Sequence, residues 1–229
     1  MFWEHAARVR FSAPRQMKIK KIGHCCLFIQ TGSLNILTDP GAYSEGQNNI
    51  KNIDVVLITH EHADHLHIES LKKVLINNSN ALVLTNSGVG KILSGEGIDH
   101  QVLEGREILE AKNVLLEAFD SKHEEIFEDI GQVQNTGFFI DKRLFYPGDS
   151  YANPEKEVDI LALPVAGPWC KVSDAIKYAL SIKPKKVFPV HDGHLLEDRI
   201  GASHKIPEKV LSQNNIEFIS MKEGDEKNF

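Results

Sequence analysis

A short apolar run that ends in a cluster of histidines constrains the fold of this chain more than any other feature. Residues 54–59, DVVLIT, are apolar between their ends, and such a run is typical of a strand that is buried on both faces of a sheet. Residues 60–67, HEHADHLH, follow at once and contain four histidines and an aspartate. Packing gives no reason to gather these side chains, whereas metal coordination does. The chain must therefore bury the strand between two layers and leave a polar segment at its end.

Strand-like runs and helical patterns alternate along the rest of the chain. The early runs are joined by tight turns, such as the one at Gly32, and favour hairpins, whereas the later runs favour strand–helix units. Hairpins are predicted at 25–40 and 137–146, inner strands at 54–59, 81–85, 158–164 and 185–190, helices at 68–76, 86–93, 172–182 and 203–213, and a last strand at 216–220. The pattern predicts one α/β domain over residues 17–229, preceded by a disordered or irregular extension at 1–16.

Composition narrows the class of protein. The formal net charge of -6 gives no reason to expect broad electrostatic binding of nucleic acid. Three cysteines, two of them adjacent (Cys25 and Cys26), make no disulfide framework, which favours a reducing, cytoplasmic location. No apolar run approaches the ~18–20 residues that cross a bilayer. We therefore expect a protein that acts on a small molecule and has no membrane partner. The sequence is compatible with a homo-oligomer.

The spacing within the histidine cluster indicates two metal ions. His60 and His62 lie two residues apart, and in an extended backbone such residues point to the same side. Asp64 and His65 fall where the chain turns into the next helix, so they are expected to face a second ion. Imidazole and carboxylate together suit zinc, manganese or iron. The alternative is a surface patch of histidines, and His67 is expected to lie on the helix in a structural role.

Four motifs resemble those of the metallo-β-lactamase superfamily of hydrolases. THEHADHLH (59–67) resembles its H-x-H-x-D-H motif, and IGHCCLFIQTGSLNILTDP (22–40) resembles its opening hairpin. LFYPGDS (144–150) resembles the strand whose Gly-Asp supplies a bridging carboxylate, and residues 161–193 resemble the segment that delivers the last histidine. The resemblance covers most of residues 17–220 and is closest to the small lactonase-like (UlaG-like) hydrolases. It implies an α/β fold, namely a four-layer αββα sandwich with two mixed sheets.

Carried over residue by residue, the resemblance implies two metal sites. The first ion would be held by His60, His62 and His123, the second by Asp64, His65 and His191, with Asp149 bridging both. Position 123 departs from the family pattern because two glutamates follow it, and His100 is the alternative third histidine. Three further residues are expected to support a ligand or contact the substrate: His24, Asp39 and His194. His24 and Asp39 each have a purely structural alternative, whereas the alternative for His194 is a metal ligand. The two divalent ions are expected to be zinc or manganese, and nickel or iron also suits these donors.

The resemblance also implies a reaction. The expected enzyme is a dinuclear metal-dependent hydrolase in which a metal-bridging hydroxide cleaves an ester, lactone or phosphodiester bond of a small substrate. Asp64 is the expected catalytic residue, because it would hold that hydroxide in line while it binds the second ion. Residues 41–52 and 165–173, which include Trp169, are the expected pocket walls. The alternatives are a di-iron oxidoreductase of the same superfamily, which usually has glutamate where this chain has His62, and a non-catalytic or nucleic-acid-processing member.

Overall fold

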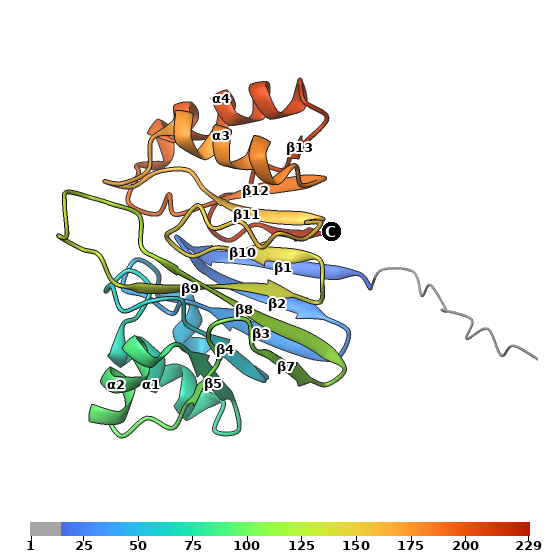
Figure 1. Ribbon diagram of the computed structural model, residues 1–229. Coiled ribbons are helices and arrows are strands. Elements are labelled where there is room, and N and C mark those ends of the chain that lie inside the picture. The colour runs from blue at the N-terminus through green and yellow to red at the C-terminus, as the bar shows by residue number, and fades with distance from the viewer. Residues whose placement is uncertain (1–14) are drawn as a thin grey trace, which may run out of the picture.

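In the described part of the chain, two seven-stranded β-sheets pack face to face, and helices cover the outer face of each sheet (Figure 1). The computed structural model describes residues 15–229. The layers follow one another as helices α1 and α2, the first sheet, the second sheet, and helices α3 and α4 (Figure 1). The prediction of a four-layer αββα sandwich with two mixed sheets is therefore confirmed.

The first sheet has the strand order β14-β1-β2-β3-β4-β5-β6. Its strands are β1 (Met17–Gly23), β2 (Cys26–Thr31), β3 (Leu34–Thr38), β4 (Val55–Leu57), β5 (Leu82–Thr85), β6 (Gln101–Val102) and β14 (Glu226–Asn228). The pairs from β14 to β3 are antiparallel, and those from β3 to β6 are parallel. Its helices are the 3-10 helix η1 (Gly46–Asn49), α1 (Ile68–Asn77) and α2 (Ser87–Gly95). Leu71 of α1 and Leu93 of α2 are buried in one apolar cluster with Val56 of β4, which attaches both helices to this sheet.

The second sheet has the strand order β13-β12-β11-β10-β9-β8-β7. Its strands are β7 (Ile108–Ala111), β8 (Val114–Lys122), β9 (Gln134–Ile140), β10 (Leu144–Tyr146), β11 (Ile160–Pro164), β12 (Lys186–Val190) and β13 (Glu217–Phe218). The pairs from β7 to β10 are antiparallel, and those from β10 to β13 are parallel. Its helices are α3 (Val172–Ile182), η2 (Glu197–Arg199) and α4 (Gly201–Ser212). Ala175 and Leu211 are buried with Leu161, so α3 and α4 cover the outer face.

The largest apolar cluster lies between the two sheets. Leu57 and Leu84 of the first sheet are buried in it together with Phe138, Ile160 and Phe188 of the second. Full burial of one such side chain stabilises a fold by about 1.5–3 kcal/mol. The inner faces of the sheets are thus held together by apolar contact, which explains why the run at 54–59 needs no polar face.

The later elements agree with the sequence patterns except at the C-terminus. The helix predicted at 172–182 has those bounds, and the helix expected at 203–213 is α4, Gly201–Ser212. The strand predicted at 216–220 is β13, but it is not the last strand, because β14 pairs with β1 at the edge of the first sheet. The prediction was wrong here because all three residues of β14 are polar and exposed. A short edge strand defined by backbone pairing alone has no apolar alternation to reveal it.

The predicted N-terminal extension, 1–16, falls almost entirely outside the described residues. Arg15 and Gln16 are described, and the Arg15 side chain donates to the carbonyl oxygen of Asn113 at 2.7 Å. Strand β1 begins at Met17, where the sequence patterns also begin. Within the described part of the chain, no helix has the length and apolar character that a membrane crossing requires.

Candidate metal centre

Strands of both sheets deliver the candidate site to one edge of the sandwich. Asp39 directly follows β3 of the first sheet, and His60 lies just beyond the end of β4. In the second sheet, His123 directly follows β8 and His191 directly follows β12, while Asp149 lies shortly after β10. Side chains that are far apart in the chain meet here because each comes after the carboxyl end of a strand, the position where open α/β sheets place ligands.

Among residues 15–229, three groups of side chains offer metal-binding atoms that lie within 4.8 Å of one another, and one of them is His24, Cys25, His65 and His191. The other two groups contain the candidate ligands. The first of these two is His60, His62 and His123, and the second is Asp64, His65, Asp149 and His191. The same residues form the two sets that the sequence resemblance implies. His100 belongs to neither group, and its Nδ1 donates to the carbonyl oxygen of Ile98 at 3.0 Å. Metal binding by both groups stays a prediction.

Asp149 lies between the two groups. Its Oδ2 atom is 3.2 Å from Nε2 of His123 and 3.8 Å from Nε2 of His60. The same oxygen is 2.8 Å from Nε2 of His191, and Oδ1 is 3.1 Å from Nε2 of His65. One buried carboxylate therefore reaches imidazoles of both groups, which is the position a bridging ligand would take.

Three of these histidines hold the same tautomer, which we infer from the partners of their Nδ1 atoms. An oxygen that only accepts must receive a proton, so Nδ1 carries the hydrogen and Nε2 presents a lone pair. Nδ1 of His65 donates to Oδ2 of Asp39 at 2.8 Å. Nδ1 of His191 donates to the carbonyl oxygen of Ala166 at 2.7 Å, and Nδ1 of His123 donates to the carbonyl oxygen of Glu124 at 2.6 Å. Such hydrogen bonds orient metal-binding imidazoles in proteins.

Thr59 and Tyr146 complete this arrangement, and neither was singled out from the sequence. The Thr59 hydroxyl donates to Asp39 Oδ2 at 2.8 Å and lies 3.0 Å from Nδ1 of His60, from which it accepts. The Tyr146 hydroxyl donates to the same oxygen of Asp39. Because a threonine that ends a strand and a tyrosine in an apolar run look like ordinary core residues, only their positions beside Asp39 reveal the role.

The nitrogen and oxygen atoms that face the centre fit divalent cations. Among residues 15–229, Nε2 of His60, His65 and His191 and Oδ1 of Asp149 are buried and have no hydrogen-bond partner. Buried polar atoms in proteins are almost always paired, so these four atoms call for another partner. Imidazole nitrogen with carboxylate oxygen is a donor set that zinc, manganese and iron accept.

The buried carboxylate of Asp149 favours positive charge at the centre. Burial disfavours a charge on His65 and His191, but Asp149 and the other acidic groups nearby together outweigh burial and raise the pKa of both imidazoles well above the usual value. Burial disfavours the Asp149 carboxylate too, yet these two imidazoles hold its pKa well below the usual range. Burial lowers the pKa of His60, whose ring stays neutral. A cation bound here would take the place of the protons.

The backbone is strained at three of the predicted site residues. The φ angles of His24, Asp39 and His191 are 48°, 35° and 63°, in the left-handed region that side chains with a Cβ rarely adopt. Such strain collects at functional sites. Gly41 allows a further close approach, because a Cβ there would lie 1.8 Å from the carbonyl oxygen of Asp64. The loop at 41–52 therefore lies directly against the metal-binding segment.

An open cavity of about 480 Å³ leads to the two groups. Tyr43 and Trp169 line it, as the sequence predicts for the segments that contain them, and Ile126 and the exposed His194 line it as well. The Nε1 atom of Trp169 donates to Oδ2 of Asp149 at 3.1 Å. Trp169 is thus both a cavity wall and a direct partner of the bridging carboxylate.

The cysteines beside the site are poor nucleophiles. Cys25 and Cys26 are buried free thiols, and burial raises the pKa of both. A thiol must ionise to attack, so their environment opposes thiol chemistry and agrees with their interpretation as small buried side chains.

The fold is a four-layer sandwich, and two adjoining groups of metal-binding side chains lie at one edge of it. Metal-dependent hydrolases have this architecture. The Beta-lactamase superfamily domain matches residues 18–191. The chain therefore belongs to the metallo-β-lactamase superfamily.

Relatives and solved structures agree with this assignment. A UPF0173 protein of Pyrococcus abyssi is 30% identical over 187 residues, which are 77% of this chain and 84% of that protein. A UPF0173 metal-dependent hydrolase of Alkaliphilus metalliredigens is 27% identical over 192 residues, 76% of this chain and 85% of that protein. The crystal structure of a metal-dependent hydrolase, described as putative, from Parabacteroides distasonis superposes with a TM-score of 0.75 at 25% identity, and covers 92% of this chain and 94% of that one.

Proposed function

We propose that this protein is a hydrolase that uses two divalent ions, zinc or manganese, to cleave an ester or lactone bond of a small uncharged substrate. One observation carries the proposal: the unpartnered Nε2 atoms of His60, His65 and His191 surround the carboxylate of Asp149 beside an open cavity. Relatives that are named metal-dependent hydrolases support the reaction class. A cytoplasmic location stays a prediction.

Each group of side chains has a distinct part in this chemistry. Two divalent ions, when bound, supply Lewis acidity, which lowers the pKa of a shared water molecule and polarises the oxygen of the scissile bond. His60, His62 and His123 would hold one ion, and Asp64, His65 and His191 the other. Asp149 would reach both ions, and the N–H of Trp169 keeps its Oδ2 in place. Asp64 lies in the cavity wall, and its carboxylate would orient the attacking water.

The lining of the cavity favours an uncharged substrate over a phosphodiester. Among residues 15–229, the side chains that line it include no lysine and no arginine. Proteins that bind phosphate usually supply one of these cations or several backbone N–H groups. Tyr43, Ile126 and Trp169 offer apolar surface instead. An ester or a lactone needs no cationic side chain, because the two metal ions can stabilise the charge that develops on its carbonyl oxygen.

The loop between β8 and β9 extends this apolar surface. Ile126 lines the cavity, while Phe127 and Ile130 pair through an isolated β-bridge and are 62% exposed each. Figure 1 shows the loop projecting beyond the ends of the sheets. Exposed apolar side chains that gather beside a site commonly contact a ligand. We propose that the loop contacts the apolar part of the substrate.

Elemental analysis followed by a substrate panel tests the proposal. We expect the purified protein to contain up to two divalent ions per chain, and to hydrolyse p-nitrophenyl esters or lactones with a higher kcat/KM than bis(p-nitrophenyl) phosphate. The double variant His60→Ala, Asp149→Ala should lose ions and turnover, whereas His100→Ala should keep both. A double variant that retained its ions and its activity would overturn the assignment. An intense iron-dependent visible spectrum without hydrolysis would favour the oxidoreductase alternative.

A further inference from the structure

His24 holds the opposite tautomer to the histidines around Asp149. Its Nδ1 accepts a hydrogen bond from the backbone N–H of Gly193 at 3.1 Å. A ring nitrogen that accepts carries no proton, so Nε2 must carry the single hydrogen of the neutral imidazole. Nε2 lies 3.2 Å from Oδ2 of Asp64, and the only role open to it there is that of donor.

This tautomer separates His24 from the metal-binding histidines although it lies among them. A metal-binding atom of its ring lies within 4.8 Å of those of Cys25, His65 and His191, and the ring centroids of His24 and His191 are 4.2 Å apart. Distance alone would therefore admit His24 as a ligand. A protonated Nε2 has no lone pair to give to a cation, however, and the lone pair of Nδ1 already accepts a hydrogen bond from the N–H of Gly193.

We infer that His24 is a positioning residue that orients Asp64 and binds no metal. Its Nε2–H holds Oδ2 of Asp64 and so keeps the carboxylate beside His191, where the second ion would bind; Nε2 of His191 lies 3.5 Å from the same oxygen. The inference rests on the proposed two-ion site, because Asp64 would be a ligand there. It assigns a role to a histidine that the sequence left undecided between the site and the core.

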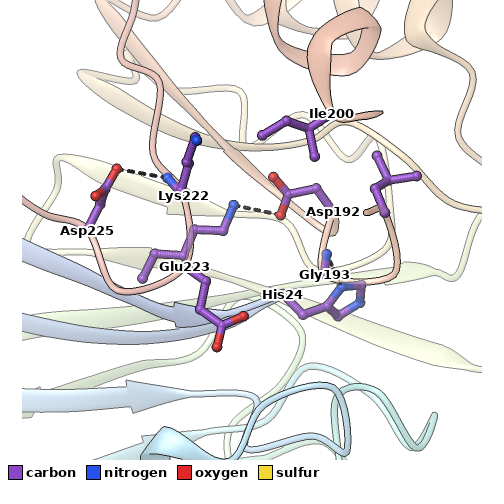
Figure 2. Close-up of a pocket in the computed structure, with 9 residues that line it drawn as sticks. His24, Asp192, Gly193, Ile200, Lys222, Glu223 and Asp225 are labelled. Carbon is purple, nitrogen blue, oxygen red and sulfur yellow. Dashed lines mark hydrogen bonds and ion pairs between the residues drawn. The ribbon is translucent and has the colours of Figure 1, made fainter. Parts of the chain in front are cut away.

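The loop after β12 is fitted closely around His24, which fixes the tautomer. The backbone N–H of His191 donates to the carbonyl oxygen of His24 at 3.3 Å. A Cβ at position 193 would lie 2.8 Å from the Cβ of His24, so only glycine can bring its N–H to Nδ1. Figure 2 shows Gly193 directly against the His24 ring, with Asp192 next to it.

A buried charged network behind this loop holds Gly193 in place. Asp192 precedes it and lines a cavity of about 530 Å³ together with His24 (Figure 2). Nζ of Lys21, which is 1% exposed, donates to Oδ1 of Asp192 at 2.6 Å, and Nε2 of His204 lies 2.8 Å from Oδ2. Buried ion pairs add little stability beyond apolar packing, and in several proteins they specify one geometry. Here the specified geometry is the approach of the Gly193 N–H to His24.

Nitrogen NMR of the histidine rings tests the tautomer. We expect long-range ¹H–¹⁵N spectra of the metal-free protein to show a protonated Nε2 and an unprotonated Nδ1 for His24. The same state should persist after the protein is loaded with ¹¹³Cd²⁺. Scalar coupling to cadmium should appear on ring nitrogens of His65 and His191 and be absent from His24. A protonated Nδ1 on His24, or cadmium coupling to either of its nitrogens, would overturn the inference.

Substitutions at the same position test the orientation of Asp64. His24→Gln keeps an N–H donor at a similar reach, whereas His24→Leu removes it. In titrations with Zn²⁺ alone, we expect His24→Leu to bind the second ion about 10–100-fold more weakly, the range seen when such supporting hydrogen bonds are lost. The first ion should bind as in the unmodified chain, and His24→Gln should recover most of the affinity. His100→Leu is the control for loss of a histidine.

The outcomes separate this inference from the proposed function. If His24→Leu bound both ions as tightly as the unmodified chain, the positioning role would be wrong while the two-ion site stood. If the unmodified chain bound no ion, the proposed function would fail, and the tautomer of the metal-free protein would still decide whether His24 donates to Asp64.

Discussion

The hydroxyl of Thr59 connects three side chains behind the candidate metal centre. It donates to Oδ2 of Asp39 and accepts from Nδ1 of His60, and the Thr59 backbone N–H donates to Oδ1 of Asp39 at 2.8 Å. Asp39 in turn accepts from Nδ1 of His65. One threonine therefore helps to set which nitrogen His60 and His65 present, and this geometry would persist whichever divalent ion binds.

Replacement of Thr59 by valine should weaken metal binding more than it weakens the fold. Valine keeps the shape of the side chain but loses the hydroxyl, so Nδ1 of His60 loses its acceptor and Asp39 loses a donor. We expect affinity for Zn²⁺ to fall about 10–100-fold, measured by competition with a chromogenic chelator. Thr85→Val is the matched control, because Thr85 is equally buried and donates only to the carbonyl oxygen of Ile58. Equal losses in the two variants would contradict this role.

Segments that follow strands, rather than the strands themselves, hold most of the functional side chains. The segment after β12 carries His191, Asp192 and Gly193, each with a different partner: the Ala166 carbonyl, the Lys21 ammonium and the His24 ring. Strand β12 fixes the position at which this segment starts, and the buried ion pair between Lys21 and Asp192 fixes the path of its backbone. Rigid strands with specifically anchored ends are a common way to hold several ligands in register.

Loss of the buried lysine should destabilise the molecule strongly. Lys21→Met leaves the Asp192 carboxylate buried with His204 as its remaining partner, and breaking a buried ion pair costs about 3–5 kcal/mol. Urea denaturation measures the change. Lys72→Met is the control, because Lys72 and its partner Glu96 are both exposed and their ion pair should matter little. A Lys21→Met variant as stable as the control would show that the network does not hold the segment.

Substitutions in the β8–β9 loop should alter substrate preference without altering chemistry. The double variant Ile126→Ser, Phe127→Ser removes apolar surface beside the cavity. We expect kcat/KM for a p-nitrophenyl octanoate to fall about tenfold and that for the acetate to stay nearly unchanged, since each methylene contact contributes about 0.8 kcal/mol. Ile76→Ser, at a residue that is 80% exposed on α1, is the control. A uniform loss for both esters would argue against contact with the acyl chain.

The candidate centre joins the two halves of the sandwich. His60 and His65 follow β4 of the first sheet, whereas His123, Asp149 and His191 follow strands of the second. Cations held by both sets would link the sheets at their edge, in addition to the apolar layer between them. Metal binding should therefore stabilise the whole fold rather than a single loop.

Metal removal should lower the melting temperature of the whole molecule. A ligand at 100 times its dissociation constant stabilises the native state by about 2.7 kcal/mol per site, which corresponds to about 5–10 °C for a domain of this size. Calorimetry of the protein treated with a chelator, before and after Zn²⁺ is added back, measures the shift. The His60→Ala, Asp149→Ala variant should show no response to Zn²⁺. An unmodified protein that melted at one temperature in both states would contradict the metal site.

The sequence predicted the residues of the candidate site better than their roles. The H-x-H-x-D-H spacing and the Gly-Asp and Val-His endings of two later strands name six of the seven candidate ligands, and the resemblance suggests His123 as the seventh; the structure brings all seven together. Thr59 and Tyr146 were missed, because a residue that acts through hydrogen bonds has no spacing of its own in the chain. His24 stayed undecided for a related reason: its tautomer depends on Gly193, which lies 169 positions away.

The sequence by itself determined the layers of this protein and the donor atoms it can offer a metal. Apolar runs that exclude water must be buried on both faces, and imidazoles placed directly after them must lie at a sheet edge. Only the tertiary structure decided which nitrogen each histidine presents and which histidine of the centre offers no lone pair. Those choices depend on hydrogen-bond partners such as Asp39, Ala166 and Gly193. Pairing of neighbouring strands brings Asp39 to His65 and Ala166 to His191, and only the packing of the two sheets brings Gly193 to His24.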